Sequence, residues 1–357
     1  MGIKTKKSIV FALNFIVALS LLVVYLSPYV NPSAYWWMGA IAYLYPTLIC
    51  LNLCFLFYWG IQKNLFFALS FFMILVGYRH MTHTIAFDIF EDDVKAGGEF
   101  KLTSYNVENF EMFNLVNDED AERSFKQFFE QQQPDVICFQ ELFSLKSKDG
   151  YAYIDTIKRI GNYAYQYLHT QEEETRQYHG INIMSKYPII ESGKIDFYEP
   201  EYSKNGSVYA DIQFPDKVVR VYSVHFQSIQ WGQGKDFKKS KEKETISGKL
   251  ARAYKLRVRQ MNTLIDHIKV SPFPAIIAGD FNEPPLSYIN AQLRIKLGMK
   301  DAFREAGFGW GSSINSTLSL TRIDYVLTDS SFSSNQFHVE KLPLSDHLPL
   351  TVNISYD

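Results

Sequence analysis

Long apolar runs near the N-terminus constrain this chain more than any other feature. Residues 8–27 are almost uninterrupted apolar side chains, and residues 35–61 form a second run rich in Trp, Tyr and Leu. A third, shorter run lies within residues 65–81. A membrane-spanning helix needs about 20 mainly apolar residues. The first two runs reach this length and the third is marginal. We therefore expect a membrane anchor over residues 1–90, with two or three transmembrane helices at about 8–27, 35–61 and 65–81.

The first run also allows an interpretation as a signal peptide, because Lys4, Lys6 and Lys7 give it a basic start. Its apolar stretch exceeds the usual signal-peptide core of ~7–15 residues, and further apolar runs follow, which favours an uncleaved anchor. The positive-inside rule places the three lysines in the cytoplasm. Three spans then put the rest of the chain on the extracytoplasmic side, which is the periplasm in a Gram-negative bacterium. If the third run is only interfacial, that part stays cytoplasmic.

The charge and the cysteine content of the chain limit the classes of protein to which it can belong. Cys50 and Cys54 lie in the second apolar run and Cys138 in an expected buried strand, which is no disulfide framework. After residue 98 the chain has more acidic than basic side chains, unlike a generally basic nucleic-acid binder. Residues 235–259, in contrast, contain ten Lys and Arg but three acids. This segment is interpreted either as a solvated surface or as a guide for a polyanion or an anionic membrane.

Beyond a linker at residues 91–98, strand and helix patterns alternate through residues 99–357, which we expect to form one catalytic domain. Helix periodicity covers residues 119–132, with phenylalanines on one face, and residues 250–268. Strand patterns cover residues 100–105, 136–139, 180–184, 186–190, 208–214, 218–225, 275–278, 322–327 and 348–354. This mixture indicates an α/β fold in which helices flank a two-layer β-sandwich (α/β/β/α).

Short polar motifs lie at the ends of the apolar strand patterns, where a strand is expected to stop. Each motif supplies a carboxylate, an amide or an imidazole. A hard divalent cation prefers oxygen ligands, and metal-assisted phosphate-ester hydrolysis also needs a base and donors to the phosphoryl oxygens. The motifs are Tyr105-Asn106-Val107-Glu108-Asn109, Phe139-Gln140-Glu141-Leu142, Gly279-Asp280-Phe281-Asn282, Arg322-Ile323-Asp324-Tyr325 and Ser345-Asp346-His347.

In this order and spacing, the motifs resemble the endonuclease/exonuclease/phosphatase superfamily from about Glu99 to the C-terminus. That group includes pancreatic-type DNases, apurinic endonucleases, neutral sphingomyelinases and inositol-polyphosphate 5-phosphatases. The resemblance implies that Glu141 is the principal metal ligand, that Asn106 lies beside it, and that Asp346 lies close to the metal. The implied cofactor is Mg²⁺, with Mn²⁺ as an alternative.

The resemblance also implies catalytic roles for the remaining matched residues. Asp280 orients or deprotonates the attacking water, and Asn282 donates to a phosphate oxygen. Asp324 hydrogen-bonds His347, which contacts the scissile phosphate, and this pairing favours the protonated imidazole. A further strand ends at His225, which resembles the second catalytic histidine of the DNase and sphingomyelinase branches. The asparagine that often accompanies that histidine in sphingomyelinases is absent from the motif.

The sequence therefore predicts a membrane-anchored, Mg²⁺-dependent phosphoesterase that hydrolyses a phosphodiester. Its leading substrate is a phospholipid or glycolipid head group, reached laterally because the catalytic domain is tethered to the bilayer. One alternative is a membrane-tethered endonuclease or exonuclease acting on DNA or RNA, and another is a non-catalytic membrane scaffold. The expected partners are the lipid bilayer and the phosphodiester substrate, and the sequence identifies no protein partner.

Overall fold

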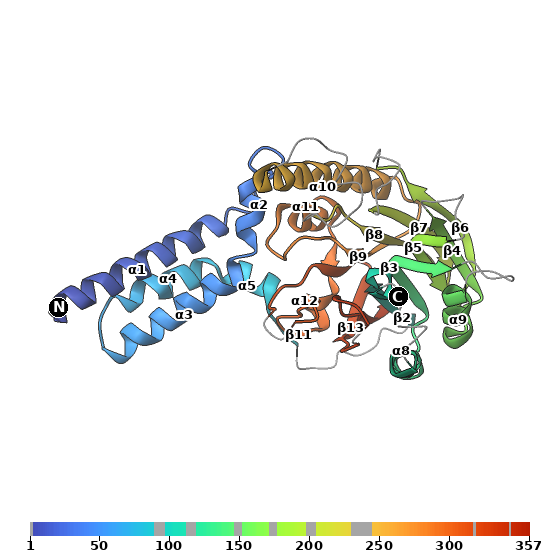
Figure 1. The fold of residues 1–357 in the computed structure, drawn as a ribbon, viewed down its shortest axis with the longest axis horizontal. Coiled ribbons are helices and arrows are strands. Elements are labelled where there is room, and N and C mark those ends of the chain that lie inside the picture. The colour runs from blue at the N-terminus through green and yellow to red at the C-terminus, as the bar shows by residue number, and fades with distance from the viewer. Residues whose placement is uncertain are drawn as a thin grey trace. The chain divides into compact units, whose positions relative to one another are not determined.

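The computed structural model describes residues 3–88, 97–111, 119–145, 152–170, 177–197, 205–229, 245–316, 319–342 and 344–357 (Figure 1). The chain divides into two compact units. One contains Met1–Ile85, Ile229–Val258 and Glu283–Ala291, and the other contains Ala86–Ser228, Arg259–Asn282 and Gln292–Asp357. Most of the expected linker at residues 91–98 lies outside the described residues, and so does the first part of the basic 235–259 segment, residues 235–244.

The first unit begins with a series of apolar helices. They are α1 (Ile3–Val24), α2 (Trp36–Ala42), α3 (Tyr45–Ile61), α4 (Phe67–Val76) and α5 (Tyr78–Thr84). The expected second span is broken, because α2 and α3 meet at a bend of 56° and Pro46 lies in the first turn of α3. The expected third span is broken at Gly77, between α4 and α5. Continuous spans over 35–61 and 65–81 are therefore corrected to helix pairs.

Among the described residues, only α1 is by itself long and apolar enough to cross a membrane, through Thr5–Val24. The bent pair of α2 and α3 passes the same test when it is taken as one span. With ten residues, α4 has a length of about 15 Å, half the ~30 Å hydrocarbon core. A helix such as α1 serves either as a membrane anchor or as a signal sequence.

Within the first unit, α1, α3 and α4 form an up-down-up bundle. At one end, the rings of Phe11 and Phe66 lie 4.1 Å apart, and Trp59 packs edge-on against Phe66 at 5.2 Å. At the other end, the Tyr25 hydroxyl donates to the Met73 carbonyl at 3.1 Å. Inside the bundle, the Ser70 hydroxyl donates to the Asn14 side-chain oxygen at 2.7 Å. The outward side chains of these helices are largely apolar and exposed; they include Leu13, Phe15, Ile16, Leu19, Phe57, Ile61, Phe71, Phe72 and Leu75.

The second unit is built from two six-stranded sheets. In the first sheet the spatial order is β10 (Lys300–Asp301), β12 (Asp324–Thr328), β9 (Ala275–Asp280), β8 (Val218–His225), β7 (Gly206–Gln213) and β6 (Ile189–Ile195). In the second it is β13 (Phe332–Val339), β14 (Leu350–Tyr356), β2 (Gly98–Asn106), β3 (Val136–Leu145), β5 (Gln177–Ser185) and β4 (Tyr165–Thr170). A separate two-stranded sheet pairs β1 (Ala86–Phe87) with β11 (Phe308–Gly309).

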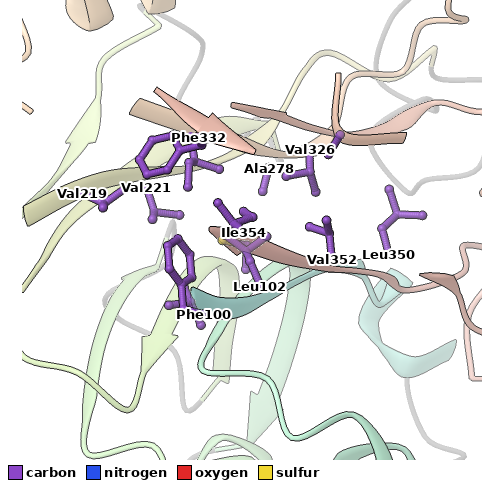
Figure 2. Packing of buried hydrophobic residues seen from close by; sticks show 14 of the residues in the cluster. Phe100, Leu102, Val219, Val221, Ala278, Val326, Phe332, Leu350, Val352 and Ile354 are labelled. Carbon is purple, nitrogen blue, oxygen red and sulfur yellow. The ribbon is translucent and has the colours of Figure 1, made fainter. Parts of the chain in front are cut away.

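The two large sheets pack face to face through one apolar core. Figure 2 shows side chains of β8, β9 and β12 facing side chains of β2 and β14. Val221, Ala278, Leu102 and Val352 are fully buried there. Full burial of one such aliphatic side chain the size of valine or leucine stabilises a fold by roughly 1.5–3 kcal/mol. This core holds the two sheets together as a sandwich.

Helices cover the outer faces of the sandwich. Phenylalanines of α8 (Glu119–Gln132) and isoleucines of α9 (Ala152–Gly161) pack with Ile137 and Phe139 of β3. On the other sheet, Tyr222 of β8 bonds to His267 near the end of α10 (Ile246–Lys269). The remaining helices are α6 (Glu108–Glu111), α11 (Tyr288–Leu297) and α12 (Ala302–Ala306). The expected two-layer β-sandwich flanked by helices is confirmed.

The connections of the strands bring the polar motifs to one edge. β2 and β3 are parallel neighbours, and so are β8 and β9, so that the carboxyl ends of each pair meet. Strand β12 runs antiparallel to β9, and its first residue, Asp324, lies opposite Asp280. Along the inward face, apolar side chains give way to polar ones toward this edge, as in Val221, Ser223 and His225. The sheet alternation that builds the core therefore also aims the catalytic candidates inward.

The structure corrects two expected strand ends. We expected a strand over 136–139 that stops before Glu141, but β3 continues to Leu145 through a register shift between Phe139 and Leu142. We also expected a strand over 322–327 with Asp324 inside it, whereas β12 begins at Asp324. Asp324 starts the hydrogen-bonded pairing of β12, and Glu141 interrupts the pairing of β3. In a pattern of apolar residues, both situations look like the end of a strand.

Gly279 allows β8 and β9 to lie close together immediately before Asp280. Its φ is 147°, and a Cβ at this position would lie 1.9 Å from the Val224 carbonyl oxygen. We expect Gly279→Ala to lower the free energy of unfolding by more than about 2 kcal/mol, because the backbone conformation and the contact both exclude a side chain. Thermal unfolding of the full chain checks this. Gly298→Ala is the control, since Gly298 has φ 66° but open space around it, and an equal loss there would contradict the steric explanation.

Candidate active site

Asp280 lies at the centre of the clustered polar residues and is buried. Its Oδ1 accepts the Asn282 backbone N–H at 2.7 Å. Its Oδ2 accepts from the side-chain amides of Asn282 and Asn106, each at 3.1 Å. Burial and the nearby Asp324 charge raise the pKa of Asp280, whereas the surrounding histidines and the Asn282 N–H oppose that rise. Fixed donors thus hold a carboxylate whose affinity for a proton is increased.

Two histidines flank Asp280. The Nε2 atom of His225 lies 3.6 Å from Asp280 Oδ2 and 3.6 Å from Glu141 Oε1. The Nε2 atom of His347 lies 3.8 Å from Asp280 Oδ2 and 3.8 Å from Asp346 Oδ1. The β-ladder fixes the first contact, because His225 and Asp280 are register partners on β8 and β9. Asp280 therefore lies between two imidazoles contributed by different parts of the chain.

Asp324 controls the charge of His347. His347 Nδ1 lies 2.8 Å from Asp324 Oδ2, so the carboxylate accepts the ring N–H. Burial lowers the pKa of His347, but the charges of Asp324 and Asp280 outweigh burial and raise this pKa to about 10. His347 is consequently an imidazolium at neutral pH, and the expected pairing of Asp324 with His347 is present in the structure.

We expect Asp324→Asn to lower the pKa of His347. A histidine carries its proton below its pKa, so the wild-type ring stays charged up to about pH 10. The variant loses the strongest acceptor charge while burial remains, and its ring therefore deprotonates at lower pH. Imidazole nitrogen NMR across a pH titration of the metal-free protein measures this shift. Asp346→Asn is the matched control with a smaller expected shift, and an unchanged pKa in Asp324→Asn would contradict the assignment.

Backbone strain marks two of the candidates. Glu141 has φ 51° at the irregularity in β3, and Asn282 has φ 52° just after β9. Left-handed backbone is uncommon for residues other than glycine, and each sparsely populated conformation costs of order 1–3 kcal/mol. Surrounding contacts compensate for this cost, as when the Asn282 amide donates to both Asp280 and the Phe226 carbonyl. The irregularity in β3 lets Glu141 reach toward His225.

Acidic side chains near Asn106 form a candidate site for a divalent cation. The Asn106 side-chain oxygen accepts the Glu108 N–H at 3.1 Å, and its carbonyl accepts the Ser345 hydroxyl at 2.9 Å. Burial, Asp346 and Glu141 together raise the pKa of Glu108 to about 7. The carboxylates of Glu108, Glu141 and Asp346 are thus close enough to affect one another, and the His347 charge offsets part of their negative charge. An oxygen-only donor set with excess negative charge fits a hard divalent cation.

Asp280, Asp324 and His347 also offer ligand atoms within 4.8 Å of one another. This second group suits a cation less well. The His347 ring is protonated and uses Nδ1 to bond Asp324, so it has no lone pair to offer there. The group is better described as a charged hydrogen-bonded unit, and the oxygens around Asn106 and Glu141 are the better metal candidates.

All the residues singled out from the sequence contribute to one region. Hydrogen bonds, ion pairs or ladder partners link Asn106, Glu141, His225, Asp280, Asn282, Asp324, Asp346 and His347. One detail differs from expectation, because both amide hydrogens of Asn282 already have acceptors, Asp280 and Phe226. Donation from Asn282 to a phosphate requires one of these bonds to be exchanged.

Sequence reasoning missed several supporting residues. Asn205 is buried beside His225, with Nδ2 3.4 Å from its Nε2 and 3.0 Å from the Phe226 carbonyl. Asn205 comes to this position because Gly206, the next residue, is the ladder partner of His225, a pairing with no local sequence signal. Ser313 is fully buried, and its hydroxyl accepts the N–H groups of Ile323 and Asp324 at 3.0 and 3.1 Å. Glu108, a motif residue to which the sequence analysis assigns no role, lies next to Asp346.

The family model described as the endonuclease/exonuclease/phosphatase family matches residues 103–347, and a model described as a domain of unknown function matches residues 7–84. No curated protein matches the chain.

Several solved structures share the fold at low identity. A family protein from Bacteroides thetaiotaomicron is 15% identical, with 73% of this chain and 98% of that chain covered and a TM-score of 0.54. One from Beutenbergia cavernae is 16% identical, with 72% of each chain covered and a TM-score of 0.52. D. rerio TDP2 complexed with a single-strand DNA product is 18% identical, with 72% and 99% covered and a TM-score of 0.50. Because the family model matches most of the chain, this protein belongs to the endonuclease/exonuclease/phosphatase family, whose members are metal-dependent hydrolases of phosphoric ester bonds.

Proposed function

We propose that the protein is a membrane-anchored, Mg²⁺-dependent phosphodiesterase that acts on a phospholipid or glycolipid head group. The observation that carries the catalytic part is the buried Asp280 held between His225 and His347 by fixed amide donors. Glu141, Asn106 and Asp346 would hold the metal, with Glu108 next to them. When bound, the cation supplies positive charge to a phosphoryl oxygen and lowers the barrier to attack.

Each catalytic side chain has a defined task in this proposal. Asp280 accepts a proton from the attacking water, which forms the new P–O bond in line with the leaving group. The raised pKa of Asp280 suits a group that must take up that proton. The His347 imidazolium, held by Asp324, donates a charged hydrogen bond to a phosphoryl oxygen. His225 donates a proton to the leaving oxygen as its bond to phosphorus breaks.

Two features of the first unit support membrane anchoring. The helices α1, α3 and α4 are apolar on their exposed sides as well as inside, which is typical of helices in lipid. The Ser70–Asn14 hydrogen bond lies within the bundle, where polar side chains commonly join helices in membranes. A catalytic domain tethered to a bilayer meets lipid head groups by lateral diffusion, which favours the lipid substrate.

A membrane-tethered nuclease is the second candidate function. D. rerio TDP2, which shares the fold, has been crystallised with a single-strand DNA product. Among the residues that the structure describes, α10 carries exposed or half-buried basic side chains near its start, including Lys249 and Arg252. A basic surface of this kind attracts nucleic-acid phosphates as well as anionic lipids.

The proposal is tested with the detergent-purified full chain and a panel of phospholipids, single-stranded DNA, RNA and a small chromogenic phosphodiester. We expect release of a phosphorylated or dephosphorylated head group from lipid, with Mg²⁺ required and excess chelator abolishing turnover. Mn²⁺ should substitute for Mg²⁺ because both accept oxygen ligands. Hydrolysis of nucleic acid but not lipid supports the nuclease instead. Full activity in excess chelator would contradict the metal requirement for every substrate.

We expect the catalytic domain to face away from the cytoplasm. Lys6 and Lys7 lie at the start of α1, and the up-down-up bundle brings the end of α4 back to the end of α1. The positive-inside rule then places both ends outside. Fusing reporters that are active on only one side of the membrane to the C-terminus checks this, with a fusion at residue 64 as the opposite-side control. Activity of the C-terminal reporter only in the cytoplasm would contradict three crossings.

A further inference from the structure

A groove opens on the bundle beside the turn that joins α3 to α4. Its volume is about 640 Å³, and it is lined by Leu56, Phe57, Gly60, Ile61, Lys63 and Phe67. All of these side chains except Lys63 are apolar. Phe57 and Ile61 are 65% and 83% exposed, so that the side chains that the structure describes leave large apolar surfaces of the groove uncovered. An apolar surface of this kind calls for an apolar occupant.

Lys63 provides the polar end of the groove. It is exposed, and its backbone lies in the left-handed region at φ 53°. Its N–H donates to the Gly60 carbonyl at 2.9 Å, which closes the turn after α3. Lys63 is also the single Lys or Arg between Lys7 and Arg79 in the sequence. The turn therefore fixes the backbone of the one lysine that lines an otherwise apolar groove.

A second source of positive charge lies at the same end of the bundle. The rings of Phe11 and Phe66 are 4.1 Å apart, which brings the start of α1 next to the α3–α4 turn. Lys7 is one helical turn before Phe11 and on the same face of α1, since residues four apart share a face. Tyr58 and Trp59 are also near this end, packed edge-on at 4.9 Å. Aromatic residues and lysines together are typical of the membrane–water interface.

We infer that this groove binds one anionic phospholipid, with an acyl chain along Leu56, Phe57 and Phe67 and the head-group phosphate at Lys63. The inference rests on the proposed membrane anchoring. The apolar lining excludes a soluble phosphate as the occupant, because such an ion would leave Phe57 and Ile61 uncovered. The ammonium groups select an anionic lipid over a zwitterionic one, since each basic residue near a membrane surface favours anionic lipid by about fivefold in binding.

Gly60 gives a way to block the groove without damaging the helix. A Cβ added at Gly60 meets no atom within 4 Å. Gly60→Leu therefore projects its side chain into the groove, and leucine is a better helix former than glycine. Lys63→Asn removes the charge and keeps a residue that tolerates left-handed backbone. Lys269→Asn, an exposed lysine at the end of α10, is the matched control.

The full-length protein is reconstituted in nanodiscs of mixed phosphatidylglycerol and phosphatidylcholine. The protein is then released under mild conditions, and native mass spectrometry measures the lipid that stays bound to it. We expect about one retained phosphatidylglycerol per chain in the wild type and in Lys269→Asn. The Gly60→Leu variant should retain no lipid. In the Lys63→Asn variant, the ratio of retained phosphatidylglycerol to retained phosphatidylcholine should fall by about fivefold or more. Wild-type lipid retention in Gly60→Leu, or equal retention of both lipids by the wild type, would overturn the proposal.

Two parallel measurements separate this inference from the proposed function. Flotation with liposomes reports anchoring, and Mg²⁺-dependent turnover of the small phosphodiester reports catalysis. We expect both to be unchanged in Gly60→Leu and Lys63→Asn, because neither residue belongs to the catalytic region. A protein that floats and turns over substrate but shows no lipid selectivity contradicts the lipid site alone. A protein that does not float contradicts both the anchor and the lipid site.

Discussion

Glu141→Gln is expected to reduce phosphoester hydrolysis by roughly two to three orders of magnitude at saturating substrate. Glutamine keeps the size of the side chain and loses the negative charge that a divalent cation needs. The loss should be accompanied by weaker Mg²⁺ binding, because we propose Glu141 as one of the oxygen ligands near Asn106. Isothermal titration of the metal and steady-state turnover, measured on the same preparations, check both effects.

Glu130→Gln is the matched control for this change. Glu130 is exposed on α8 and lies 3.9 Å from Lys126 in an exposed helical pair, which contributes little to stability. Its replacement should leave metal binding and turnover unchanged. If Glu141→Gln binds Mg²⁺ as tightly as the wild type and retains its activity, then Glu141 is not the principal metal ligand. A folded variant with a native melting temperature is required for either conclusion.

His347→Ala is expected to lower turnover by roughly 10²–10⁴-fold, and Asp324→Ala should add little to that loss. The reason is the 2.8 Å bond between the two side chains, through which Asp324 keeps His347 protonated. Once the imidazole is absent, the carboxylate has no ring to hold. A double-mutant cycle on the small phosphodiester measures the coupling between the two positions.

The pH dependence gives this prediction a second readout. Because the pKa of His347 is raised to about 10, wild-type turnover should fall on the alkaline side only near that pH. In Asp324→Ala the alkaline limb should move to lower pH, since the proton is held less tightly. Losses that multiply in the cycle, with an unmoved alkaline limb, would show that Asp324 and His347 act independently.

The sequence predicted the catalytic fold well because alternation in strands is a local property. The helix at 119–132 is confirmed with the same limits in α8, and the strands expected over 208–214 and 218–225 are confirmed as β7 and β8, which pair antiparallel. The order of motifs was enough to predict that residues far apart, such as Asn106 and His347, belong to one site. Parallel pairing of β2 with β3 and of β8 with β9 supplies the physical reason.

Features that depend on three-dimensional pairing could not be read from the chain. Asn205 lies beside His225 because of an antiparallel strand pairing, and the Ser313 hydroxyl bonds to Asp324 from a loop. Neither contact is marked by a pattern in the nearby sequence. The left-handed residue in β3 breaks the strand pattern at Glu141, and apolar content alone gave no sign of it. Likewise, hydropathy predicted continuous spans over 35–61 and 65–81, whereas Pro46 and Gly77 mark the places where these helices break.

The left-handed backbone at Glu141 and Asn282 has a consequence for protein engineering. Glycine adopts left-handed backbone without strain, so replacing Glu141 or Asn282 by glycine should stabilise the fold. A selection for thermostable variants would therefore favour loss of the residues that we assign to metal binding and phosphate contact. Stability and activity would then trade against each other at these two positions. A thermostable enzyme of this kind is better sought by changing residues on the outer helices, where the backbone is already relaxed and no catalytic group is lost.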